Sequence, residues 1–138
     1  MLRKVVIVMS VFLKILLVVV IIFVLAVAGG IFYLTRGLGE GAKLVINSVD
    51  PAGLPDGEYN GSYKGGRWTN EMKVTVRDQK ITQIEVVKDV AIAKPEVTQD
   101  VITKVINKQN VDIDAVSGAT VTTKAYLKSI ENALSKAE

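Results

Sequence analysis

The chain has 138 residues, 17 Lys and Arg against 14 Asp and Glu, a net charge of +3, and neither His nor Cys. The length fits one domain. Without Cys there is no disulfide, thiolate nucleophile or Cys-ligated metal or iron–sulfur site, and without His there is no imidazole base or ligand. Zinc hydrolases and thiol redox proteins are therefore excluded. Three classes of function remain: a metal site made of carboxylates, an organic cofactor bound by the protein, or a protein without chemistry of its own.

The N-terminal part of the chain predicts a membrane anchor over residues 1–36. Residues 15–34 form 20 consecutive positions without a charge, which is the length needed to cross a hydrocarbon core of about 30 Å. Phe32 and Tyr33 stand at the far end of this span, where aromatic residues favour the membrane interface. We therefore expect a transmembrane helix with its span at about 15–34.

Basic residues predict the orientation of this anchor. Arg3, Lys4 and Lys14 precede the span without any acidic residue, so the positive-inside rule places the N-terminus in the cytoplasm and the C-terminal domain outside it. A cleaved signal peptide ending at the A-x-A site of Ala28 is the alternative. A single-pass anchor in the cell membrane is preferred, because the apolar run continues past that site to Leu34 and exceeds a signal-peptide core.

The positive charge belongs to the anchor and not to the rest of the chain. Four basic residues lie within 1–36, whereas residues 37–138 hold 13 basic and 14 acidic residues, a net charge of −1. The outer part therefore lacks the basic footprint of a nucleic-acid-binding domain, and no nucleic-acid partner is expected.

The remaining sequence predicts a linker and one small domain. Residues 37–56 are rich in Gly and Pro and indicate a linker. In the domain, 57–138, alternating apolar residues predict three antiparallel strands. These strands cover residues 58–64, 69–77 and 80–88. Gln79 stands in the second turn, where Gly or Asn is usual.

Helical spacing of apolar residues follows the three strands. It predicts a helix after Pro95 that ends at Asn107 or Asn110, and a second helix over 121–137. Residues 111–116 form a short extended segment between them. The order β-β-β-α-β-α predicts an α+β domain, a small antiparallel sheet covered by helices, preceded by one transmembrane helix.

Hydroxyl and Gly residues gather where the chain enters the last helix. The sequence from Asp114 to Thr123 reads DAVSGATVTT. A helix N-terminus offers free N–H groups and partial positive charge to a phosphate, and Gly118 permits close approach of a ligand to the backbone. From spacing alone a simple Ser or Thr helix cap is the preferred interpretation.

This string, with the helix after it, resembles the signature of the FMN-binding domain family. Related domains occur in the C subunit of the sodium-translocating NADH:quinone reductase and the G subunit of Rnf complexes. DGEYNGSYKGG and VTVRDQKITQIEV upstream are also similar to that family's opening, so that the resemblance covers roughly Asp56–Leu134. The family's E-T-x-G-type segment is not evident around 90–99, and the resemblance assigns no flavin contacts there.

The resemblance implies a covalent flavin. It implies that FMN is joined by a phosphoester to Thr120, through the action of a flavin transferase that recognises Asp114. The other cofactor-binding residues that it implies are Ser117, Gly118, Ala119, Thr122 and Thr123. We expect Tyr59, Tyr63 or Trp68 as candidates for packing against the flavin ring, with packing on the sheet as the equal alternative.

The other charged residues near the motif are interpreted as solvent-exposed surface residues. Asp112 and Asp114 could bind a cation, but exposed acids are the norm, so no metal site is assigned. Lys124 and Lys128, one helical turn apart, could flank the phosphate, although a solvated helix face is preferred.

The sequence thus predicts a membrane-anchored, extracytoplasmic flavoprotein that relays electrons between a membrane redox partner and an acceptor, with the flavin supplying the redox chemistry. The alternative is an anchored non-redox binding or assembly module in which Thr120 is only a helix cap. An enzyme with its own substrate is disfavoured, because the chain has no convergent acid–base set.

Overall fold

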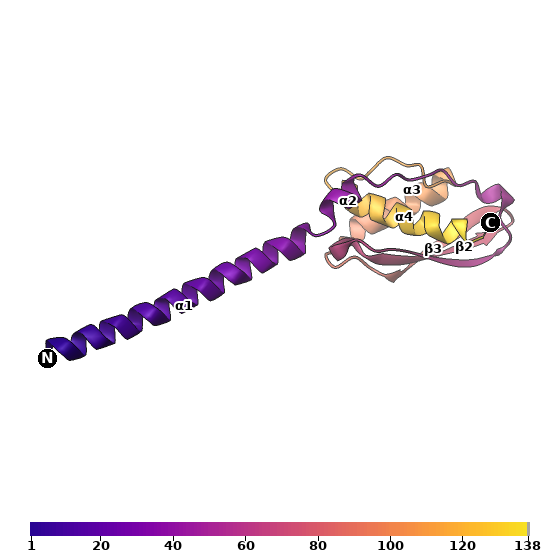
Figure 1. The fold of residues 1–138 in the computed structure, drawn as a ribbon. Helices are drawn as coiled ribbons and strands as arrows, with labels where there is room; N and C mark the ends of the chain where they lie inside the picture. The colour runs from indigo at the N-terminus through magenta and orange to yellow at the C-terminus, as the bar shows by residue number, and fades with distance from the viewer. Residues whose placement is uncertain (138) are drawn as a thin grey trace. The chain divides into compact units, whose positions relative to one another are not determined.

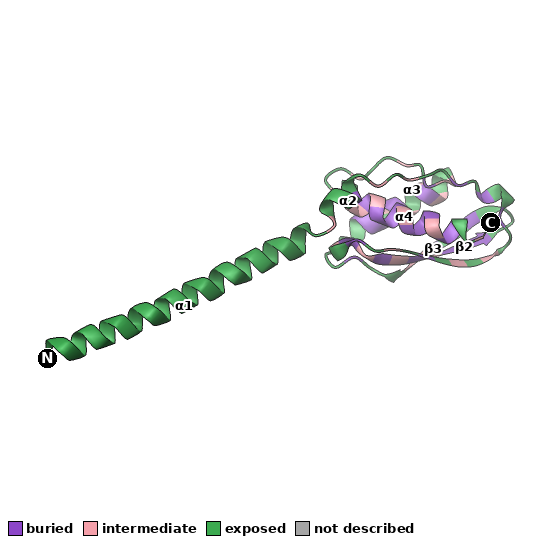
Figure 2. Ribbon diagram, in the orientation of Figure 1, coloured by how far each residue is buried: buried purple, intermediate pink, exposed green. Residues whose placement is uncertain are grey.

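The computed structural model describes residues 1–137, and the chain divides into two units, Met1–Thr35 and Arg36–Glu138 (Figure 1). The first unit is the helix α1 (Leu2–Thr35), whose 34 residues span about 50 Å at 1.5 Å per residue. All of its side chains are exposed (Figure 2). Its most apolar stretch has a mean hydropathy of 3.3, and among the described residues it is the one helix long and apolar enough to cross a membrane. It is therefore a candidate anchor that contains the expected span.

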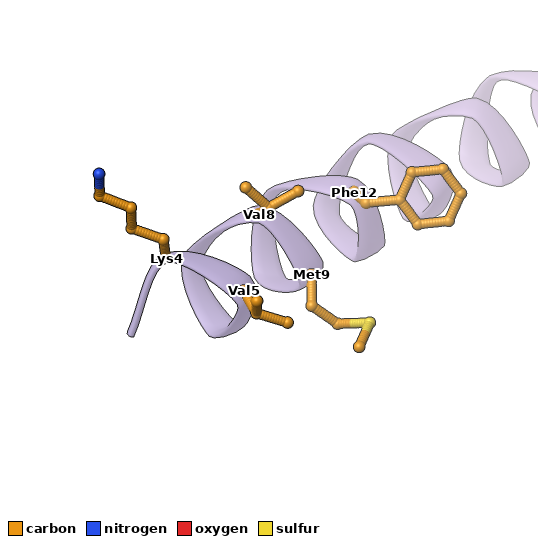
Figure 3. Close-up of a pocket in the computed structure, with 5 residues that line it drawn as sticks. All are labelled: Lys4, Val5, Val8, Met9 and Phe12. Carbon is orange, nitrogen blue, oxygen red and sulfur yellow. The ribbon is translucent and has the colours of Figure 1, made fainter. Parts of the chain in front are cut away.

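A shallow hollow near the N-terminus of α1 has no partner element. It is lined by Lys4, Val5, Val8, Met9 and Phe12, all of them on this helix (Figure 3). Figure 3 shows the side chains pointing outward in several directions. An open apolar surface on a single helix suits lipid chains and does not enclose a ligand.

The second unit is built on a three-stranded antiparallel sheet with the order β1-β2-β3. The strands β1 (Gly57–Tyr63), β2 (Asn70–Arg77) and β3 (Lys80–Lys88) confirm the three expected strands within one residue at each end. Short helical turns η1 (Pro51–Gly53) and η2 (Gly66–Trp68) precede β1 and β2. The inward residues of β2, Met72, Val74 and Val76, are fully buried, which follows from their alternation in the sequence.

Two helices cover one face of this sheet (Figure 1). The helix α3 is Pro95–Lys108 and α4 is Thr120–Ser135. Pro95 starts α3, where its missing N–H costs no hydrogen bond. The helix α4 has nine buried residues, of which Ala125, Tyr126, Ile130, Ala133 and Leu134 are fully inaccessible. The α+β class is confirmed.

Residues 111–116, expected as an extended segment and counted as a fourth β element, form no strand in the described chain. The reason lies at the edge of β3. Gln109 occupies it: its side-chain oxygen accepts from the Ile81 N–H at 2.7 Å, and its amide donates to the Ile81 carbonyl at 2.9 Å. The N–H of Val116 instead donates to the Thr123 hydroxyl at 3.1 Å. The segment therefore packs irregularly beside the helices.

Residues 37–56, expected as a linker, lie within the second compact unit. The short helix α2 (Leu38–Ala42) begins the segment, and Val49, Pro51 and Leu54 are buried. A flexible linker would leave such residues in water. We call residues 38–50 the strap, because the contacts described below hold them along α4.

Tyr126 ties α4 to its surroundings through a buried hydroxyl. The hydroxyl donates to Asp89 Oδ1 at 2.5 Å and lies 3.0 Å from Thr98 Oγ1 on α3. Asp89 also accepts from the Val90 N–H at 2.8 Å, in the loop after β3. Burial, with the Asp89 hydrogen bond second, raises the pKa of Tyr126 above its ordinary value of 10.0.

The turn between β2 and β3 is strained. Asp78 and Gln79 both have positive φ, 50° and 62°, which a two-residue hairpin turn requires. Gln79 lacks the freedom of Gly, and a left-handed conformation costs a residue with a Cβ roughly 1–2 kcal/mol.

We expect Gln79→Gly to raise the free energy of unfolding of the second unit by about 0.5–1 kcal/mol, because relief of strain exceeds the added chain entropy. Urea unfolding of the full chain in detergent micelles, followed by the fluorescence of the single, buried Trp68, measures this. The matched control is Gln83→Gly on β3, whose free energy of unfolding should fall by roughly 0.5–1 kcal/mol. A lower free energy of unfolding in both variants would contradict backbone strain at Gln79.

Tyr126→Phe is expected to lower the free energy of unfolding by about 1–2 kcal/mol, since Asp89 and Thr98 lose a shared partner. The raised pKa adds a pH dependence. The folded chain keeps Tyr126 protonated, so its contribution is complete below pH 10 and falls as the unfolded tyrosine ionises above it. Between pH 9 and 11 the stability of the wild type should therefore decline more steeply than that of Tyr126→Phe. Parallel curves of stability against pH for the two proteins would argue against a raised pKa of Tyr126.

Candidate functional site

The predicted motif forms a tight turn that leads into α4. The N–H of Ala119 donates to the Val116 carbonyl at 2.9 Å and closes a four-residue turn. Gly118 is its third residue and has a φ of 74°, a conformation for which Gly is preferred. Ser117 and Gly118 are exposed, and Asp114 is exposed just before them. The turn therefore presents its backbone to solvent.

The first turn of α4 has unsatisfied N–H groups. Ala119 is the N-cap, and its side chain carries no oxygen that could accept from the helix. The Thr123 N–H donates to the Ala119 carbonyl at 2.8 Å. Within residues 1–137, no acceptor for the N–H groups of Thr120, Val121 and Thr122 is found. Such groups, with the helix dipole, favour an anion.

Two threonines of this turn have different environments. Thr123 is fully buried, and its hydroxyl accepts from the Val116 N–H at 3.1 Å and donates to the Ala119 carbonyl at 2.8 Å. This hydroxyl is enclosed and braces the turn, and the expected contact of Thr123 with the cofactor stays a prediction. Thr120 is exposed, and its hydroxyl has no hydrogen-bond partner in the described chain. Thr120 is the first helical residue and does not cap α4 by its side chain.

A hollow of about 200 Å³ adjoins the turn on the Thr122 side of α4. We call it the cationic hollow, because Arg67 and Lys94 contribute the charged side chains. Its lining is Arg67, Ile92, Lys94, Val97, Gly118, Ala119 and Thr122. The Ala91 N–H donates to the Arg67 carbonyl at 2.8 Å and joins the loop after β3 to η2. Two cations beside free N–H groups favour a phosphate.

Sequence reasoning missed Arg67, Ile92 and Lys94. They lie 26 to 53 positions before Thr120, and only the packing of η2, the loop after β3 and the start of α3 brings them to the turn. One signal was available, since Lys94 directly precedes Pro95 and therefore sits at the N-terminus of a predicted helix. Ile92 is 51% exposed beside the hollow.

A second hollow, of about 190 Å³, lies on the Thr123 side of α4. It is mainly apolar and runs between the strap and residues 111–115. Its lining is Leu44, Ile46, Val111, Asp112, Ile113, Ala115, Thr123, Lys124 and Leu127. The first turns of α4 thus have a cationic surface on one side and an apolar surface on the other.

The aromatic candidates do not line either hollow. Tyr59 donates its hydroxyl to the Pro55 carbonyl at 2.7 Å, and Tyr63 packs beside Gly65. Trp68 is 3% exposed, with the Arg67 guanidinium 4.1 Å from its ring centroid. These contacts match the packing alternative.

Three charged residues near the motif, Asp112, Lys124 and Lys128, have partners within the protein. Lys124 and Lys128 donate to strap carbonyls, of Ala42 at 2.8 Å and Val45 at 3.2 Å, and not toward the cationic hollow. Asp112 lies 3.8 Å from Lys108. Among residues 1–137, no group of three acidic, His or Cys side chains could hold a metal ion.

Comparison with known proteins agrees with this site. No curated protein matches the chain. The sequence profile of the FMN-binding domain matches residues 64–135, which is more than half of the chain and includes the turn, α4 and every residue that lines the cationic hollow. The chain therefore belongs to the FMN-binding domain family.

Proposed function

We propose that this protein carries FMN covalently on Thr120 and relays electrons at the outer surface of the membrane that holds α1. The observation that carries the proposal is the contrast within one helical turn. Thr123 is buried and has both a donor and an acceptor as partners, whereas the Thr120 hydroxyl is exposed and unpartnered in the described chain. A hydroxyl of this kind is open to modification.

The residues around Thr120 suit the phosphate of FMN. The unpaired N–H groups of residues 120–122 and the side chains of Arg67 and Lys94 supply donors and positive charge. Attachment would join Thr120 Oγ1 to the phosphorus of the FMN phosphoryl group of a flavin dinucleotide, break that donor's bond between its two phosphates, and release a nucleoside monophosphate as the leaving group, while the hydroxyl proton passes to a base. The chain has no His or Cys to take that proton, so we assign the base to a flavin transferase, which Asp114 would help to recruit.

The size of the site supports transfer of electrons and not enclosure of a substrate. The cationic hollow, at about 200 Å³, is smaller than the roughly 300–1,000 Å³ of typical small-molecule pockets. It can hold only part of FMN, and the apolar Ile92 and Val97 would contact what lies beyond the phosphate. A flavin held in this way supplies redox chemistry while one side stays open to a partner.

We expect flavin fluorescence on the protein band of a denaturing gel when the chain is produced with an active flavin transferase. Thr120→Ala should abolish it, because the proposal places the phosphoester on Oγ1 of this residue. The matched control is Thr103→Ala, an exposed threonine on α3, which should keep the fluorescence. A dark wild-type band despite active transferase would overturn the proposal, as would a bright Thr120→Ala band.

The absence of Cys allows a direct test of membrane orientation. Ser135→Cys, on exposed α4 surface, should react with a membrane-impermeant thiol reagent in intact cells. Leu2→Cys should react only after permeabilisation, because the basic N-terminus stays inside. The opposite pattern of labelling would show that the topology is reversed. A protein whose mass is lower by that of residues 1–28 would show that the N-terminal segment is a cleaved signal peptide.

A further inference from the structure

The strap follows α4 in the same direction, held by polar contacts at successive turns. Lys124 Nζ donates to the Ala42 carbonyl at 2.8 Å, and Lys128 Nζ donates to the Val45 carbonyl at 3.2 Å. Asn47 then donates twice to Glu131, from its backbone N–H at 3.1 Å and its side chain at 3.0 Å. The chain segment nearest the anchor in sequence is therefore fastened to the helix that begins with Thr120.

Glu131 makes detachment of the strap from α4 energetically unfavourable. It is 5% exposed, and besides Asn47 it is paired with Lys128 at 3.0 Å. If the strap left, this buried carboxylate would lose two of its donors, and a buried charge without partners is strongly unfavourable. The docked strap is therefore the stable arrangement.

The strap also reaches the first turn of α4. Gly41 of α2 is buried, and a Cβ at this position would lie 2.6 Å from Val121 Cγ1, too close for two carbon atoms. Val121 directly follows Thr120. The helix α2 is thus packed without spare room against the residue next to the proposed attachment point.

We propose that the strap is a positioning element for Thr120. Gly41, through its contact with Val121, holds the first turn of α4 in the geometry needed for FMN attachment. This inference rests on the proposed function, but it concerns residues outside the matched FMN-binding domain. It predicts that displacement of α2 loosens the turn and slows attachment, although neither Gly41 nor Val121 carries a group that reacts.

The test compares Gly41→Ala with Gly39→Ala in the full chain. Both glycines lie on α2, so both substitutions change helix propensity alike, but a Cβ at Gly39 meets nothing within 4 Å. Two quantities are measured: covalent FMN per chain with active transferase, and hydrogen exchange of the Val116 and Thr123 amides without flavin. Both amides are hydrogen bonded within the turn, so their exchange reports its order independently of FMN.

We expect Gly41→Ala to speed exchange of both amides and to slow attachment by about tenfold, as overpacking by one methyl group commonly has effects of this size. Gly39→Ala should match the wild type. Adding Val121→Ala to Gly41→Ala removes the clashing methyl group and should restore both quantities. This rescue distinguishes positioning from general damage to the fold.

Asn47→Ala provides a second variant if Gly41→Ala does not fold. It removes one strap contact far from Thr120 and should change both quantities in the same direction to a smaller extent. Unchanged exchange in these variants, or faster exchange with undiminished attachment, would overturn the inference. A wild-type chain that never acquires FMN would overturn the proposed function instead, and the exchange data would still decide whether the strap orders the turn.

Discussion

The close approach of α4 to β1 is the constraint on which the second unit depends. A Cβ at Gly61 would lie 2.0 Å from the Ser129 carbonyl oxygen and 2.2 Å from the Ala133 nitrogen, so the helix backbone rests directly on the strand backbone. No side chain could separate them without moving α4. The helix is therefore fixed on the sheet along its C-terminal half, and its first turn, with Thr120, lies beyond this contact.

Side chains of α4 and of the residues that end α3 and α4 satisfy part of each open edge of the sheet. On the β1 edge, Asn132 of α4 and Lys136 directly after it donate to the carbonyls of Ser62 and Asn60, both at 2.8 Å. On the β3 edge, Gln109 pairs with both backbone groups of Ile81. Unpaired edge groups invite association with other chains, and side chains occupy the groups of these three residues. A three-stranded sheet of this size gains its stability from such covering.

The parts of this fold that the sequence predicts are those with local causes. A charge-free run of 20 residues requires a helix of membrane length, and strict alternation at residues 72, 74 and 76 requires a half-buried strand. The motif before α4 was likewise readable, because its Gly and hydroxyl residues act through the turn that they form. In each case, neighbours in sequence are neighbours in space.

The parts that could not be predicted depend on distant contacts. The strap looks like a linker because its apolar residues are isolated among glycines, and its fastening needs Glu131, over 80 positions away. The segment before the motif has strand-like composition, yet Gln109 already holds the edge that it would join. Arg67 carries no local pattern, and the helix start at Lys94 does not indicate that the two side chains line one hollow.

Charge shows why these distant contacts matter most for the function. Residues 37–138 carry a net charge of −1, so this part of the chain has no overall positive charge to attract an anionic cofactor. Donors and positive charge favour a phosphate, and the free N–H groups of the first turn lie beside a hollow lined by Arg67 and Lys94. Lys124 and Lys128 could have added to this charge but are committed to the strap. Two lysines of α4 thus fasten the strap on one side of the helix, while Lys94 lines the cationic hollow on the other side.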